Sequence, residues 1–125
     1  MGYAAFSLDR EVAHLEIEVQ KGDFRGNLTL TLTAPTAEAI ASFAAELRSP
    51  TLSAANLSID DFGLLNISVS SRDRTGHYAI SIELSYDGNS AKVALVVDYS
   101  QILEFSNQLR TLIEGRVENF TVQEF

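Results

Sequence analysis

The sequence predicts an α+β fold in which one antiparallel sheet of about six strands carries two amphipathic helices on one face. Several runs of the chain alternate apolar and polar residues, which is typical of strands with one buried face. Two other segments repeat their apolar residues every three to four positions, which is typical of amphipathic helices. The length of 125 residues, with 46% hydrophobic and 21% charged residues, fits a single domain spanning residues 1–125.

The first third of the chain is predicted to form strands. Residues 13–20 and 28–33 alternate apolar and polar side chains, and a shorter extended segment at 3–8 precedes them. The segment 21–26 between the two main runs contains two glycines, which tolerate positive φ. We therefore expect a hairpin with a longer loop.

A helix is predicted next. Thr36 is a plausible N-cap, and the pair Ser49-Pro50 ends the helix. Positions i, i+3, i+4 and i+7 form its buried stripe: Ile40, Phe43, Ala44 and Leu47. Residues 51–61 lack a clear period, which predicts a loop with at most a short extended piece.

Three more strands are predicted at 65–70, 78–86 and 91–97. The first two alternate and have one buried face each. The third is apolar at nearly every position, which favours a central strand covered on both faces. The sequence Asp-Gly-Asn-Ser at 87–90 is typical of a hairpin turn rather than a calcium loop, because it lacks the alternating oxygen ligands.

The second helix is predicted to begin at Asp98, which has capping-box spacing to Gln101, with Ser100 as the alternative cap. Gly115 can supply the left-handed residue at its end. Its buried stripe consists of Ile102, Phe105, Leu109, Leu112 and Ile113. Residues 117–122 then add an edge strand.

The two helices share a pattern. Ile-x-x-Phe-x-x-x-Leu occurs at 40–47 and again at 102–109, and the same offset maps the first hairpin onto the strands at 77–97. This indicates two βββα halves. The alternative is that two helices packed on one sheet select similar stripes independently.

No residues are grouped as catalytic chemistry requires. The chain has no cysteine, and His14 and His77 lie in or beside different strands, so the sequence predicts no catalytic residue, no metal and no cofactor. It also lacks the phosphate-binding and nucleophile motifs. The alternative to a non-enzymatic protein is a pocket between sheet and helices to which Tyr78, Tyr86 and Tyr99 contribute hydroxyls.

The net charge of −8 and the isoelectric point near 4.6 disfavour nucleic acid as a partner. No apolar stretch approaches the roughly 20 residues that span a bilayer, and no signal sequence is evident. We therefore expect a cytoplasmic monomer or weak homodimer without membrane contact. Acidity suits a basic protein partner. The candidate partner-binding residues are Glu16, Glu18, Thr29, Thr31, Asp60, Asp61 and Glu83. The alternative is that these residues only form a solvated face.

Residues 27–115 resemble small bacterial immunity proteins of the WapI-like kind and related uncharacterised domains. The resemblance rests on Gly-Asn-Leu-Thr-Leu at 26–30, Gly-His-Tyr-Ala-Ile-Ser at 76–81, and Val-Ala-Leu-Val-Val-Asp at 93–98 running into the second helix. The tryptophans associated with such relatives are absent. The resemblance implies a protein that neutralises a toxin domain by binding it, and it transfers no functional residue.

Overall fold

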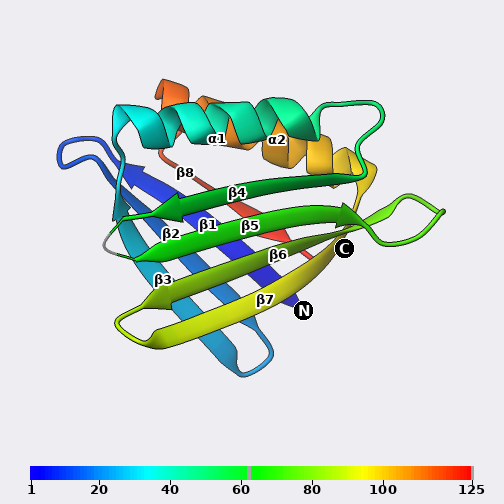
Figure 1. The fold of residues 1–125 in the computed structure, drawn as a ribbon, viewed down its shortest axis with the longest axis horizontal. Helices are drawn as coiled ribbons and strands as arrows, with labels where there is room; N and C mark the ends of the chain where they lie inside the picture. Colours follow the sequence, from blue (N-terminus) through cyan, green and yellow to red (C-terminus); the bar gives the residue numbers. More distant parts are fainter. Residues whose placement is uncertain (62, 125) are drawn as a thin grey trace.

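The computed structural model describes residues 1–61 and 63–124 of the chain (Figure 1). In chain order the elements are β1 (Gly2–Asp9), β2 (His14–Lys21), β3 (Phe24–Thr31), α1 (Ala34–Leu47), β4 (Ala54–Asp60), β5 (Leu64–Ser71), β6 (His77–Tyr86), β7 (Asn89–Asp98), α2 (Tyr99–Glu114) and β8 (Asn119–Gln123). The strands form two antiparallel four-stranded sheets. Sheet A has the order β3-β2-β1-β8, and sheet B has the order β4-β5-β6-β7.

The α+β class is confirmed, but the single sheet of about six strands is wrong. The two sheets cross one another and bury their apolar faces between them, while α1 and α2 lie side by side along one side of the molecule (Figure 1). An alternating strand can bury its apolar face against a second sheet as well as against helices. The sequence pattern is the same in both cases, so alternation alone could not separate them.

Two strands differ from their predictions. Residues 51–61 contain β4, whose alternate residues Ala55, Leu57 and Ile59 are buried, whereas a loop was expected. Strand β7 is the edge of sheet B rather than a central strand, and its Ala94 is exposed on the outer face. A small apolar residue tolerates solvent at little cost, so an alanine on the exposed face gave β7 the continuous apolar sequence that is typical of a strand buried on both faces.

The hairpin turns follow the local sequence. The hairpin turn predicted at 87–90 is confirmed. It consists of two residues, because Asp87 and Gly88, with φ values of 50° and 80°, join the paired residues Tyr86 and Asn89. Strands β2 and β3 are also joined tightly, because Lys21 already pairs with Phe24. The longer loop predicted there is therefore wrong.

The helix ends are capped by side chains. The capping box of Asp98 and Gln101 is present, and Gly115 ends α2 with a φ of 89°, as predicted. Helix α1 is capped by Thr33 rather than by Thr36, whose amide instead donates to the Thr33 hydroxyl. The cap moves upstream because proline is tolerated within the first turn of a helix, where its missing N–H is not needed.

Side chains from elsewhere in the fold reach the last turn of each helix. The hydroxyl of the fully buried Ser106 on α2 donates to the carbonyl oxygen of Ala44 on α1. The guanidinium of Arg10 donates to the carbonyl oxygen of Leu112 near the end of α2. Carbonyls in the last turn lack regular helical partners, so these bonds satisfy them. The Ser106 bond ties α1 to α2, and the Arg10 bond ties the β1–β2 connection to α2.

The same arrangement occurs twice along the chain. Three consecutive strands and a helix are followed by one strand, first as β1-β2-β3-α1-β4 and then as β5-β6-β7-α2-β8. In the first half, the buried residues Phe6 on β1 and Ile17 on β2 are paired across the two strands. In the second half, Ile67 on β5 and Ile82 on β6 are buried and paired in the same way. The predicted βββα pattern is therefore present in both halves, with one added strand. Each added strand pairs in the sheet of the other half.

Candidate functional site

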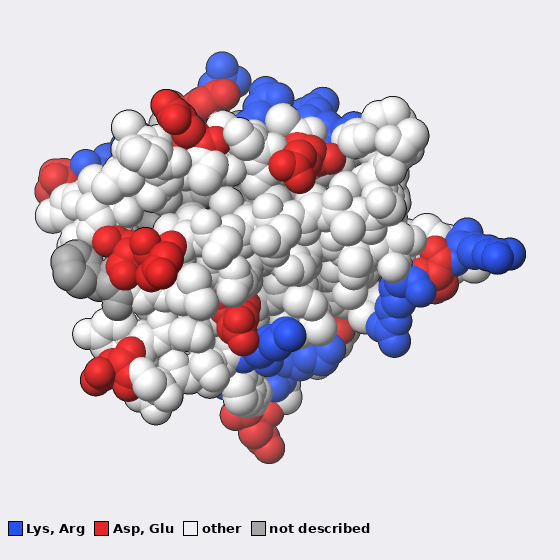
Figure 2. Space-filling view, in the orientation of Figure 1, with Lys and Arg blue, Asp and Glu red and all other residues white. Residues whose placement is uncertain are grey.

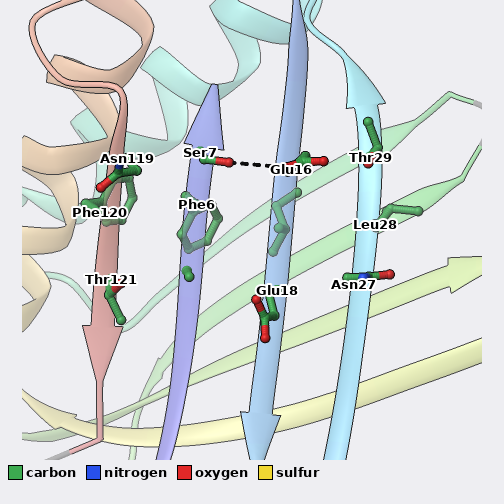
Figure 3. A pocket seen from close by; sticks show the side chains of 12 residues that line it. Phe6, Ser7, Glu16, Glu18, Asn27, Leu28, Thr29, Asn119, Phe120 and Thr121 are labelled. Carbon is green, nitrogen blue, oxygen red and sulfur yellow. Dashed lines mark hydrogen bonds between the residues drawn. The ribbon is translucent and has the colours of Figure 1, made fainter. Parts of the chain in front are cut away.

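The outer face of sheet A is hollowed above β1. Figure 3 shows the four strands of this sheet side by side, with Glu16 and Glu18 on β2 next to β1. The hollow has a volume of about 310 Å³, and Ala5 and Ser7 line it. These two side chains are short, so the longer residues of the flanking strands form its walls. Those wall residues are Glu16, Glu18, Asn27, Thr29, Asn119 and Thr121.

A second hollow adjoins the first at the end of β1. Its volume is about 410 Å³, and it shares Ser7, Glu16 and Asn119 with the first hollow. Three further acidic residues line it, namely Asp9, Glu11 and Glu118. Together the two hollows form one surface, which we call the carboxylate trough and define by its acidic residues. These are Asp9, Glu11, Glu16, Glu18 and Glu118.

Hydroxyl groups on β1 hold two of these carboxylates. The Tyr3 hydroxyl donates to Glu18 Oε1 at 3.0 Å, and the Ser7 hydroxyl lies 3.5 Å from Glu16 Oε2 (Figure 3). The bond to Glu18 raises the pKa of Tyr3 above its usual value, because ionisation would place two negative charges together. Tyr3 therefore remains a donor at neutral pH and orients the Glu18 carboxylate.

Little positive charge offsets the trough. Among its described lining residues, Arg10 is the single basic side chain. The Arg10 guanidinium donates to the carbonyl oxygen of Leu112 rather than to a carboxylate of the trough. The trough therefore combines five carboxylates with one cation, and such a concave surface attracts cationic groups.

The sequence-predicted site residues divide between two faces. Glu16, Glu18 and Thr29 lie together in the trough region, as predicted. Glu83 does not join them, because it lies on the outer face of sheet B, where Asn66 donates to it at 3.4 Å. The expectation of one shared polar face is wrong, since the outer faces of two packed sheets point in opposite directions.

The other three predicted residues lie at the ends of strands. Thr31 ends β3, and its amide donates to Asp61 Oδ2 at 3.2 Å. Asp60 is exposed at the end of β4. None of the three lines the carboxylate trough.

Sequence reasoning missed Asp9, Glu11 and Glu118. Asp9 ends β1 and Glu11 lies in the connection to β2, so the hairpin signal could have placed both near Glu16. Glu118 reaches them only because β8 pairs with β1, where the Leu8 amide donates to the Glu118 carbonyl at 2.9 Å. No local pattern indicates that pairing.

The outer face of sheet B has a different character. Its hollow of about 360 Å³ is lined mainly by serine and asparagine, with Glu83 and Lys92 on neighbouring strands. Figure 2 shows a broad area without charged side chains on this side of the molecule. This face therefore lacks the one-sided charge of the trough.

The three tyrosines of the alternative pocket do not meet at one place, because Tyr86 lies apart from Tyr78 and Tyr99. Tyr86 is 59% exposed at the tip of the β6–β7 hairpin. The rings of Tyr78 and Tyr99 pack on each other with centroids 5.8 Å apart, and their hydroxyls lie 3.5 Å from backbone carbonyl oxygens. Within residues 1–61 and 63–124, no group of three or more potential ligands is arranged to hold a metal ion.

A second cluster of polar contacts lies in the β5–β6 connection. Asp73 accepts hydrogen bonds from the Thr75 hydroxyl at 2.7 Å and the Thr75 amide at 2.9 Å, and His77 Nδ1 lies 2.9 Å from its other oxygen. These bonds, led by the Thr75 hydroxyl, hold the pKa of Asp73 far below its usual value. The cluster orders the connection and lies apart from the trough.

Asp73→Asn is expected to lower the melting temperature at pH 7. A depressed carboxyl pKa contributes stability at pH values above the unfolded value of 3.8, and this contribution is lost as the pH falls through the lower folded value. The difference in melting temperature between the wild type and the variant should therefore shrink below pH 3.8. Thermal unfolding across pH would measure it, with Asp23→Asn in the β2–β3 turn as control. A difference that grows on acidification would contradict the assignment.

No family model, curated protein or solved structure matches this chain. Among the helices in the described part of the chain, neither is long and apolar enough to cross a membrane.

Proposed function

We propose that the protein is a non-enzymatic binding protein that takes a basic segment of a partner protein into the carboxylate trough. The observation that carries this proposal is the gathering of five carboxylates around two adjoining hollows, with one basic side chain among the described residues that line them. A lysine or arginine placed there gains charge-assisted hydrogen bonds. The overall charge of −8 adds attraction over a longer range.

The shape of the trough suits an extended segment. From Ala5 to Asp9 it follows β1, a distance of about 13 Å at 3.3 Å per residue. Strand β1 lies between β2 and β8, with hydrogen-bonded neighbours on both sides. A surface built on paired strands needs little ordering when it binds, which favours affinity.

We further propose that the partner is a toxin domain, which the protein neutralises by binding. The support is the resemblance of residues 27–115 to WapI-like immunity proteins, together with the acidity of the trough. A toxin domain that acts on nucleic acid carries a basic surface for phosphate groups, and the trough complements such a surface.

The test first examines the genes beside the one for this protein, where a toxin domain is expected, and then uses that domain. Co-expression of the wild-type chain should restore growth, and the purified pair should bind more weakly as salt is added. The double variant Glu16→Gln and Glu18→Gln should lower the affinity by about tenfold to a hundredfold, because it removes two charges without changing side-chain size.

The matched control is the double variant Glu38→Gln and Glu46→Gln. Both residues are exposed on α1, so the control makes the same change in net charge away from the trough. If both double variants lose the same affinity, the loss comes from the lower net charge of the protein and not from the carboxylates of the trough. A neighbouring toxin that neither binds nor is neutralised would overturn the assignment of the partner.

A further inference from the structure

The two sheets each end in an edge strand near the place where they meet. Strand β3 is the edge of sheet A, and β7 is the edge of sheet B. The polar backbone groups on such an edge can pair with a strand of another molecule. In this protein, side chains from elsewhere in the chain form hydrogen bonds with some of these backbone groups.

A lysine and a glutamate cover the middle of the β7 edge. The Val96 amide donates to Glu124 Oε2 at 3.3 Å, and Lys21 Nζ donates to the Ala94 carbonyl oxygen at 2.8 Å. Lys21 and Glu124 also form an ion pair at 2.8 Å. A donor and an acceptor on the same edge are therefore both satisfied.

Glu124 is fixed in place by the start of β1. The Gly2 amide donates to Glu124 Oε1 at 3.1 Å, and the Glu124 amide donates to the Gly2 carbonyl oxygen at 2.9 Å. The Glu124 side chain is only 13% exposed. It is therefore a held group rather than a loose surface carboxylate.

The β3 edge has a corresponding contact. The Thr31 amide donates to Asp61 Oδ2 at 3.2 Å. Asp61 directly follows β4, and Glu124 directly follows β8, the added strands of the two halves. Each carboxylate thus comes from one sheet and binds the edge strand of the other.

The two contacts occupy equivalent positions in the two halves. Thr31 lies five residues after Gly26, and Val96 lies five residues after Ala91. Gly26 and Ala91 contact each other where the two sheets meet. Asp61 lies four residues after Leu57, a buried residue of β4, and Glu124 lies four residues after Phe120, a buried residue of β8. The same device therefore appears twice in the fold.

We propose that Asp61 and Glu124 are edge clips, which close β3 and β7 to the addition of a strand from a second copy of this chain. The expected occupant of an opened β7 edge is another β7. Two antiparallel copies centred on Leu95 place the Val96 amide of each opposite the Ala94 carbonyl of the other, which is a self-complementary contact. This proposal is independent of the proposed function.

Amide hydrogen exchange measured by NMR tests the clips directly. The Thr31 and Val96 amides of the wild type should exchange at least about tenfold more slowly than in the variants Asp61→Ala and Glu124→Ala, respectively. Rapid exchange of both amides in the wild type would overturn the proposal.

Oligomeric state supplies the second readout. The double variant Asp61→Ala and Glu124→Ala should form dimers or larger species that increase with concentration in size-exclusion chromatography with light scattering. The double variant Asp61→Asn and Glu124→Gln keeps acceptor oxygens and should remain monomeric. The control is Asp60→Ala with Glu104→Ala, which makes the same change in net charge at exposed positions and should also remain monomeric.

Each result bears on the proposal. A monomeric double-alanine variant with intact circular dichroism, or a wild type that already pairs through these edges, would overturn it. If the double-alanine variant does not fold, the exchange rates of the wild type and the behaviour of the amide variant decide the question.

Discussion

Replacing Phe105 by alanine is expected to destabilise the protein by about 3–5 kcal/mol. Phe105 is 1% exposed on α2, and its ring centroid lies 5.8 Å from Phe6, 6.1 Å from Phe120 and 6.3 Å from Phe43. It therefore joins both helices to sheet A. Truncation loses the transfer free energy of the ring and leaves a cavity that rigid neighbours cannot fill.

Chemical denaturation followed by circular dichroism would measure this loss. In thermal unfolding, we expect the melting temperature to fall by on the order of 10–20 °C for a chain of this size. Phe24→Ala is the matched control, because Phe24 is 45% exposed at the start of β3. Its cost should stay below about 1 kcal/mol. Similar costs for the two variants would contradict the central role of the aromatic cluster.

Gly26→Ala is expected to cost about 1–3 kcal/mol, even though alanine suits a strand better than glycine does. A Cβ atom at Gly26 would lie 2.6 Å from the Ala91 Cβ, well inside normal contact, where β3 meets β7. The two strands belong to different sheets, so relieving the clash requires the sheets to move apart.

A double-mutant cycle isolates this contact. Ala91→Gly removes the opposing methyl group, so the variant with both changes should be more stable than the sum of the two single effects predicts. Free energies of unfolding for the four proteins would give the coupling. Additive effects would show that the cost of Gly26→Ala does not arise from the approach of the two sheets.

The sequence predicted the local elements better than their assembly. Alternation placed most strands, and the stripe and capping box placed α2, because these signals depend on neighbours within a few residues. Strand β4 was predicted as a loop with at most a short extended piece, because Leu52 and Ala54 lie out of register with the alternating residues Ala55, Leu57 and Ile59. The division into two sheets arises because β4, which follows α1, pairs with β5 and not with β3, and sheet A is completed by the pairing of β1 with β8 from opposite ends of the chain.

The candidate site was predicted in part for the same reason. Glu16 and Thr29 face each other across a local hairpin, so strand alternation was sufficient to group them. Glu83 has the same local pattern but lies in the other sheet, and Glu118 enters the trough only through long-range pairing. A prediction from periodicity identifies which side of a strand is polar, and it does not identify which sheet that strand joins.

The pairing of β1 with β8 also fixes an order of events during synthesis. The four strands of sheet B are consecutive in the chain, so all of them are synthesised before β8. Sheet A remains one strand short until then, and its core lacks Phe120 and Val122. Until β8 emerges, the edge of β1 that pairs with it has no partner strand, and Phe6 lacks the ring of Phe120 that stacks on it. Native packing of sheet A therefore completes only at the end of this segment's synthesis.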